Sequence, residues 1–135
     1  MIIEPKIRNN ICLTAHPEGC KAQVESQIGY VKSQGSMEGA KKVLVIGSSN
    51  GYGLASRIVS VFGCGASSIG VSYERPGTTS KTASSGWYNE AAFRQAAEQE
   101  SHPAWSVNGD AFSEEVKEEV LGLIREQLGQ VDMVV

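Results

Sequence analysis

The sequence predicts an α/β fold in which helices cover both faces of a doubly wound parallel sheet, and three observations lead to this class. Beyond residue 40, apolar runs typical of strands alternate with segments of helical periodicity, from a first strand to a fourth. The run Val43–Ile46 is unbroken and aliphatic, as in a parallel strand that is covered on both faces. A glycine-rich turn, Gly47–Gly53, joins this run to the first of these helices. Such alternation implies right-handed crossovers and a layered α/β architecture.

The residues before this alternation are expected to form an extension, 1–40, with one helix. Pro5, Pro17 and Gly19 interrupt regular structure, so residues 1–20 are predicted to be irregular. Apolar residues then recur at spacings of four and three from Val24 to Val31, which predicts a helix over residues 21–32. The sheet itself is assigned to residues 41–135.

Each later element has its own signal in the sequence. Apolar runs predict strands, and apolar residues at helical spacing predict helices. Asn89 and Ser113 are expected to cap the second and third of these helices, and Gly129 to end the third. The strands are expected at 43–46, 68–73, 104–107 and 131–135, and the helices at 54–61, 89–99 and 114–128. Because the last run stops without a turn or cap, we expect the sheet to be incomplete, truncated after its fourth strand.

Composition narrows the classes of partner. The net charge of −3 argues against a nucleic-acid partner, which usually requires a basic surface. No apolar run approaches the roughly 20 residues that span a bilayer, so no membrane association is expected. The first residues lack the pattern of a secretory signal, and three cysteines are an odd number, so we expect a cytoplasmic protein with reduced thiols.

The spacing of Cys12, His16 and Cys20 raises the question of a metal site. Steps of four would align all three on one helical face, but Pro17 and Gly19 lie within this stretch. A fourth ligand at a recognisable spacing is also missing, whereas zinc sites use four ligands or three and a water. We therefore expect no metal site and predict a loop here.

The glycine-rich turn carries the strongest functional signal. A dinucleotide pyrophosphate binds at a helix N-terminus, where unpaired amides and the helix dipole favour anions. Glycines allow the tight turn and remove Cβ atoms that would block this approach. The spacing of Gly47, Gly51 and Gly53 differs from G-x-G-x-x-G and is closer to the short-chain dehydrogenase variant. Between a strand and a helix, this turn predicts a Rossmann-type fold, with residues 41–135 forming a partial NAD-binding domain.

Acidic residues at the ends of two strands indicate the sugar and base contacts. Glu74 follows the second strand, about 20 residues beyond the turn, where an acid commonly binds the adenosine ribose hydroxyls. Its carboxylate would repel a 2′-phosphate, so NADH is favoured over NADPH, although Arg75 could pair with that phosphate. Asp110 and Ala111 follow the third strand and are candidates for adenine contacts. Simpler interpretations remain open: Glu74 as a solvated charge at a turn, and Asp110 as a turn or capping residue.

Several segments resemble the trans-2-enoyl-CoA reductases, a family that includes the V-type enoyl-acyl-carrier-protein reductases. The resemblance spans the chain and is carried by Pro5–Arg8, Cys12–Cys20, Val43–Arg57, Gly86–Asn89, Asn108–Ser113 and Leu128–Asp132. It implies an NADH-preferring, monomeric enzyme, longer than this chain, that reduces the double bond of enoyl-CoA or enoyl-acyl-carrier-protein in fatty-acid synthesis.

The resemblance also implies the roles of individual residues. Cofactor contacts map onto Gly47, Ser48, Ser49, Asn50, Gly51, Tyr52, Tyr73, Glu74, Asp110 and Ala111. The family has a basic residue at the position of Arg75, so this arginine no longer argues for NADPH. The catalytic tyrosine and lysine of the family lie downstream of Val135, so no catalytic residue is expected and this piece should be inactive alone. Tyr73 and Lys81 are not that pair, because their spacing is one residue too short.

Two other functions remain as alternatives. One is a non-catalytic Rossmann-type nucleotide-binding module, and the other is an ordinary short-chain dehydrogenase that acts on alcohols. The long segment before the first strand disfavours the latter, whose chains usually begin close to that strand.

Overall fold

The computed structural model describes residues 2–135, which form a four-stranded parallel sheet with the strand order β5-β4-β3-β6. Every neighbouring pair in this sheet is parallel. The chain runs outward from β3 to β5 and then returns to place β6 on the other side of β3, which confirms the doubly wound α/β fold. The strands are β3 (Lys42–Ile46), β4 (Ser67–Ser72), β5 (Ala104–Asn108) and β6 (Met133–Val134).

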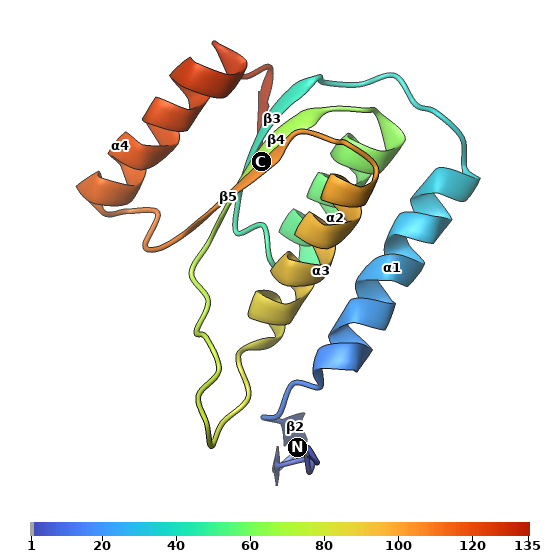
Figure 1. The fold of residues 1–135 in the computed structure, drawn as a ribbon, viewed down its shortest axis with the longest axis vertical. Helices are drawn as coiled ribbons and strands as arrows, with labels where there is room; N and C mark the ends of the chain where they lie inside the picture. Colours follow the sequence, from blue (N-terminus) through green and yellow to red (C-terminus); the bar gives the residue numbers. More distant parts are fainter. Residues whose placement is uncertain (1) are drawn as a thin grey trace.

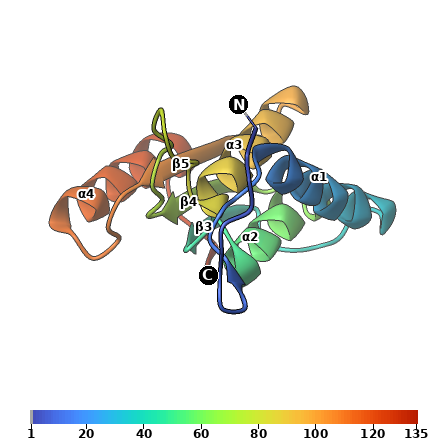
Figure 2. The same cartoon turned by 90° about the horizontal axis from the view of Figure 1, so that it is seen from below.

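Helices lie on both sides of this sheet, as Figures 1 and 2 show. Three of them gather on one side, whereas α4 lies on the other, because the connection from β5 to β6 crosses the sheet where the strand order reverses. Two π-helical turns, η1 and η2, continue α2 and α4. The helical segments are α1 (Pro17–Ser33), α2 (Gly51–Ile58), η1 (Val59–Gly63), α3 (Ser85–Gln99), α4 (Glu114–Leu123) and η2 (Ile124–Leu128).

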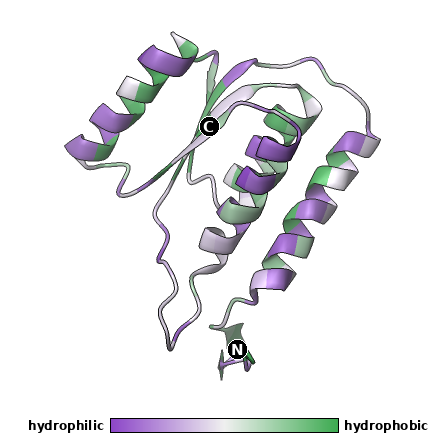
Figure 3. Cartoon of the chain, viewed as in Figure 1, coloured by the Kyte–Doolittle hydropathy of each residue, from purple (hydrophilic) through white to green (hydrophobic). Residues whose placement is uncertain are grey.

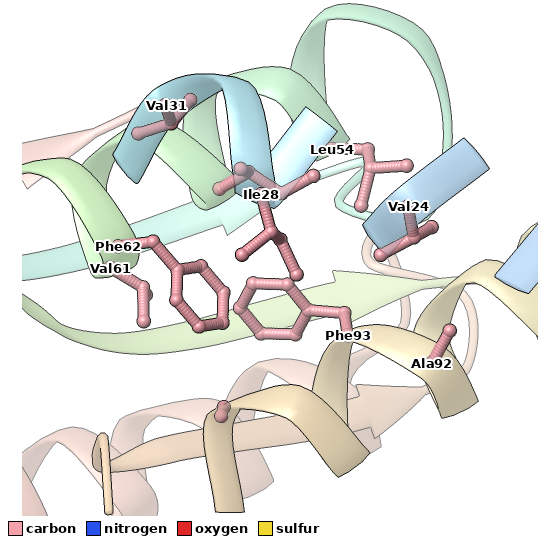
Figure 4. Packing of buried hydrophobic residues seen from close by; sticks show 10 residues of the cluster. Val24, Ile28, Val31, Leu54, Val61, Phe62, Ala92 and Phe93 are labelled. Atoms are coloured by element: carbon pink, nitrogen blue, oxygen red, sulfur yellow. The ribbon is translucent and has the colours of Figure 1, made fainter. Parts of the chain in front are cut away.

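The larger core cluster lies between the three helices of the first side. Figure 4 shows Phe62 and Phe93 meeting edge to face, with their ring centroids 5.8 Å apart. Val24, Ile28 and Val31 add the apolar stripe of α1 to the same cluster. The predicted helix of the extension therefore shares one core with α2 and α3.

A second cluster lies between the sheet and α4. It joins Leu44 and Ile69 of the sheet to Val116, Val120 and Leu128 of the last helical segment. Figure 3 shows hydrophilic and hydrophobic turns on both outermost helices, α1 and α4, as expected for helices with one buried face. None of the helices within residues 2–135 is long and apolar enough to cross a membrane.

The prediction of an irregular segment over residues 1–20 was wrong. Strands β1 (Ile7–Arg8) and β2 (Ile11–Cys12) form a short antiparallel hairpin. Helix α1 then begins at Pro17, because proline suits the first turn, where no amide needs an intrahelical acceptor. His16 caps this helix, since its Nδ1 accepts a hydrogen bond from the Gly19 amide at 3.3 Å.

Two of the three residues predicted to begin or end a helix within residues 41–135 were confirmed. Ser113 caps α4, with its Oγ accepting from the Val116 amide at 3.3 Å, and Gly129 ends η2 with φ of +76°. Asn89 was wrongly predicted as a cap: α3 begins at Ser85, and Asn89 lies buried inside it.

Pairing of the last strand reaches the end of the chain. The Val135 amide donates to the Leu44 carbonyl at 2.9 Å, and the Ile46 amide donates to the Val135 carbonyl at 2.8 Å. The strand predicted over residues 131–135 is thus present, with its ladder beside β3.

Candidate functional site

The turn after β3 requires glycine at three positions, for two reasons. Gly47 and Gly51 have φ of +87° and +53°, in the left-handed region that side chains disfavour. At Gly53, a Cβ atom would overlap the carbonyl group of Gly47 and lie 2.8 Å from its carbon. The first turn of α2 can therefore pack against the end of β3 only because this residue has no side chain.

The first part of this turn is held by the neighbouring strand. The amides of Gly47 and Ser48 both donate to the Val71 carbonyl of β4, at 2.8 and 3.0 Å. The Ser48 hydroxyl donates to the same carbonyl at 3.2 Å, and its side chain is fully buried. These two amides are already used within the protein, so a ligand would meet these residues through other atoms.

The start of α2 is open to an anion. Asn50 is the N-cap residue of this helix, yet its side chain makes no capping hydrogen bond. The first amides of a helix have no intrahelical acceptor, and Gly51 and Tyr52 are exposed. These unpaired amides and the helix dipole make this end of α2 a suitable place for a phosphate group.

The Glu74 carboxylate lies beside this helix start. Its Oε1 accepts from the Ser49 hydroxyl at 2.5 Å and from the Asn50 amide group at 3.4 Å. None of the ion pairs formed within residues 2–135 includes Glu74, which is half-buried. The carboxylate is thus held by neutral donors, and no cationic side chain within residues 2–135 pairs with it at the carboxyl edge of the sheet.

Three residues around this carboxylate were missed by sequence reasoning. Asn108 pairs with the Glu74 backbone: its Oδ1 accepts from the Glu74 amide at 2.7 Å, and its Nδ2 donates to the Glu74 carbonyl at 3.0 Å. From α3, Gly86 lies against the carboxylate, and Asn89 donates to the Ser49 carbonyl and to the Asn50 side chain. A polar asparagine among the apolar positions of a helix was the available signal for Asn89. Nothing in the local sequence indicated the pairing of Asn108.

The end of β5 is organised differently. The Asp110 carboxylate accepts from the Phe112 amide at 2.9 Å, and its carbonyl accepts from the Ser113 hydroxyl at 2.8 Å, so this residue forms the turn before α4. Ala111 borders an apolar cavity of about 240 Å³. The other residues lining it are Leu44, Ile46, Val71, Val116, Lys117, Val120, Leu121 and Ile124.

The two predicted tyrosine contacts lie at the surface. Tyr52 is 94% exposed and Tyr73 is 79% exposed.

A second cavity, of about 170 Å³, begins beside Glu74 and runs between α3 and the ends of β4 and β5. Trp87, Glu90, Arg94 and Asn108 are among the residues that line it.

A buried charge lies beneath this second cavity. The Arg57 side chain of α2 is fully buried, and its Nη1 donates to both carboxylate oxygens of Glu90 at 2.9 and 3.0 Å. Its Nη2 donates to the Trp105 carbonyl at 2.6 Å, its Nε donates to the Ser68 hydroxyl at 3.2 Å, and its guanidinium lies 4.3 Å from the centre of the Phe93 ring. Burial lowers the pKa of Arg57, and the charge of Glu90 opposes this shift.

No group of three or more metal-ligating side chains occurs within residues 2–135. In the segment considered for a metal, His16 caps α1, and Cys12 and Cys20 are free thiols. Burial raises the pKa of the Cys20 thiol.

Two family models together match almost the whole chain. Residues 2–79 match the NAD(P)H binding domain of trans-2-enoyl-CoA reductase, and residues 81–135 match the trans-2-enoyl-CoA reductase catalytic region. The boundary does not divide the structure, because β4 from the first range and β5 from the second are neighbours in one sheet.

Curated relatives and solved structures agree with these models. The chain is 57% identical to an enoyl-[acyl-carrier-protein] reductase [NADH] of Flavobacterium psychrophilum and 58% identical to a trans-2-enoyl-CoA reductase [NADH] of Ruminiclostridium cellulolyticum. Each alignment covers 100% of this chain and 34% of the relative, so the chain spans about a third of their length.

The solved structures extend the similarity to the fold. The trans-2-enoyl-CoA reductase of Treponema denticola, in complex with NAD, has a TM-score of 0.92 and 46% identity over 99% of this chain and 35% of its own. The enzyme of Clostridium acetobutulicum, in complex with NADH, has a TM-score of 0.94 and 38% identity over 99% of this chain and 34% of its own. The chain therefore belongs to the trans-2-enoyl-CoA reductase family.

Proposed function

We propose that residues 1–135 are the cofactor-binding part of a longer, NADH-dependent reductase of 2-enoyl thioesters. One observation carries this proposal: the Glu74 carboxylate, which forms no ion pair within residues 2–135, lies beside the N-terminus of α2, where Asn50 makes no capping hydrogen bond. A dinucleotide has a pyrophosphate group and, next to it, a ribose diol, which suit a helix N-terminus and a neighbouring carboxylate.

The proposed pose assigns one part of the cofactor to each feature. The pyrophosphate lies against the first amides of α2, and the adenosine ribose donates its hydroxyls to Glu74. The adenine ring enters the apolar cavity beside Ala111, where flat aromatic faces contact aliphatic side chains. The carboxylate excludes a 2′-phosphate by charge repulsion, which favours NADH over NADPH.

When bound, the dinucleotide supplies the hydride that reduces the carbon–carbon double bond. The residues of this chain bind and orient it, and we assign no catalytic residue to positions 1–135. The acyl carrier stays open between coenzyme A and acyl-carrier protein, because both occur in the names of similar proteins. A monomeric, cytoplasmic enzyme without nucleic-acid or membrane partners completes the proposal, and analytical ultracentrifugation tests the monomer.

The test uses the complete gene product that contains these residues. We expect it to oxidise NADH in the presence of crotonyl-CoA or crotonyl-acyl-carrier protein, measured as the fall in absorbance of NADH. Residues 1–135 expressed alone should show no turnover. A complete protein that binds NADH without reducing either thioester would instead support the non-catalytic module, and turnover by residues 1–135 alone would contradict the absence of catalytic residues.

A further inference from the structure

We propose that Gly86 and Asn89 of α3 are positioning residues that hold the Glu74 carboxylate where it selects NADH over NADPH. This inference rests on the proposed function, because it deepens the role of Glu74 in cofactor binding. Neither residue needs to touch the cofactor, since each acts through the side chains of Glu74 and Asn50.

Gly86 makes room for the carboxylate. A Cβ atom at this position would overlap the Oε1 and Cδ atoms of Glu74 and would lie 2.6 Å from the Asn50 Nδ2. Glycine weakens a helix relative to alanine, so its place in the first turn of α3 has a local reason in this contact. The atoms in the way are the ends of two flexible side chains, so an added methyl group would displace the carboxylate and leave the backbone in place.

Asn89 orients the amide group that meets this carboxylate. Its buried Nδ2 donates to the Asn50 Oδ1 at 2.9 Å and to the Ser49 carbonyl at 3.0 Å. The Ser85 hydroxyl donates to the same Asn50 Oδ1 at 3.4 Å. Because this oxygen accepts from α3, the Nδ2 of Asn50 faces Glu74 and donates to it.

The backbone of Glu74 is fixed independently. Asn108 at the end of β5 binds its amide and its carbonyl, so the main chain cannot follow a displaced side chain. The position of the carboxylate is therefore set by the Ser49 hydroxyl, by the Asn50 amide group that Asn89 orients, and by the contact with α3 at Gly86. Hydrogen bonds to the ribose hydroxyls require oxygen atoms about 2.5–3.0 Å apart, so a displacement by one methyl radius removes them.

The experiment measures the Kd for NADH and for NADPH in the complete protein, by titration of the fluorescence of each reduced dinucleotide. The variants are Gly86→Ala, Glu74→Ala and the double variant, with Gly29→Ala as the matched control. A Cβ at Gly29 meets no atom within 4 Å, and this residue also lies in a helix. We expect Gly86→Ala to raise the Kd for NADH about tenfold, which is the scale of losing a hydrogen bond to a charged group. The Kd for NADPH should not rise.

The double variant tests whether Gly86 acts through Glu74. If it does, adding Gly86→Ala to Glu74→Ala changes the Kd for NADH less than twofold, because the displaced group is already gone. A tenfold loss that persists in the Glu74→Ala background, or an equal loss for both dinucleotides, would overturn the inference. So would an unchanged Kd for NADH in Gly86→Ala.

If Gly86→Ala fails to fold, Asn50→Ala tests the same inference. Asn50 is exposed and makes no capping bond, so its truncation leaves α2 in place. We expect a two- to fivefold rise in the Kd for NADH that disappears in the Glu74→Ala background, and persistence of the rise would count against the inference. If the unmodified protein binds neither dinucleotide, the proposed function itself fails, which is a different result from any of these.

Discussion

Glu74 and Glu90 line the same cavity, yet the protein surrounds their charges in different ways. Glu90 receives two hydrogen bonds from the Arg57 guanidinium and a third from the Ser106 hydroxyl. Within residues 2–135, the donors to the Glu74 carboxylate are the neutral groups of Ser49 and Asn50. One carboxylate is paired with a buried cation inside the fold, and the other forms no ion pair within residues 2–135.

This difference separates a structural charge from a functional one. Burying a guanidinium costs several kcal/mol of hydration, and the paired carboxylate offsets this cost, so Arg57 and Glu90 depend on each other for stability. A half-buried carboxylate without a cation stays hydrated and has free acceptor capacity for the hydroxyls of a ligand. The comparison predicts that the two regions respond to substitution in different measurements, stability for the first and cofactor binding for the second.

The largest effect is expected from Arg57→Met. It removes the buried cation, leaves Glu90 unpaired and should lower the free energy of unfolding by about 3–5 kcal/mol. Urea denaturation of the complete protein measures this loss. Adding Glu90→Gln removes the orphaned charge and should restore part of the stability, and a further loss in this double variant would show that the two groups do not act as a pair.

Gly70→Ala tests the same buried region from the side of the sheet. The new methyl group would overlap the Arg57 guanidinium and lie 2.7 Å from the Ser48 hydroxyl. We expect the free energy of unfolding to fall by about 1–3 kcal/mol, the usual range for overpacking. Gly122→Ala is the control, because a Cβ there meets no atom within 4 Å. Equal stability of the two variants would contradict the tight packing around Arg57.

Glu74→Ala should affect cofactor binding rather than stability, the opposite of Arg57→Met. We expect it to weaken NADH binding by about 1–3 kcal/mol, because a hydrogen bond to a charged group is lost, while the free energy of unfolding changes by less than about 1 kcal/mol. Calorimetric titration with NADH and urea denaturation report the two quantities. A variant that loses stability and keeps its NADH affinity would place Glu74 with Glu90 as a structural charge.

The smallest effect is expected from Asn108→Ala, which removes both side-chain bonds to the Glu74 backbone. We expect NADH affinity and stability each to fall by about 0.5–1.5 kcal/mol, the net contribution of one such hydrogen bond. The same two measurements apply. If NADH affinity is unchanged, the hydrogen bonds between Asn108 and the Glu74 backbone do not contribute to the position of the carboxylate.

Much of the fold could be predicted because its signals are local. The aliphatic run before Gly47 predicted the central strand, and the helix of Ser113–Gly129 was correctly bounded by its cap and its terminal glycine. The segment before Lys21 could not be predicted, since Pro17 reads as a breaker until His16 is seen to cap the helix it begins. Asn89 was wrongly predicted as a cap because asparagine favours that position, whereas here it lies within α3 and its side chain binds the Ser49 carbonyl.

The sequence by itself determined the order of strands and helices, the glycine turn and the place of Glu74 at the end of a strand, because periodicity, backbone freedom and chain order act over a few residues. Only the tertiary structure decided which groups surround each carboxylate. Arg57 reaches Glu90, and Asn108 reaches the Glu74 backbone, across more than thirty residues of chain. Such contacts depend on how α2 and α3 pack against the sheet and on which strands are neighbours in it, and a pattern of a few residues does not determine that packing.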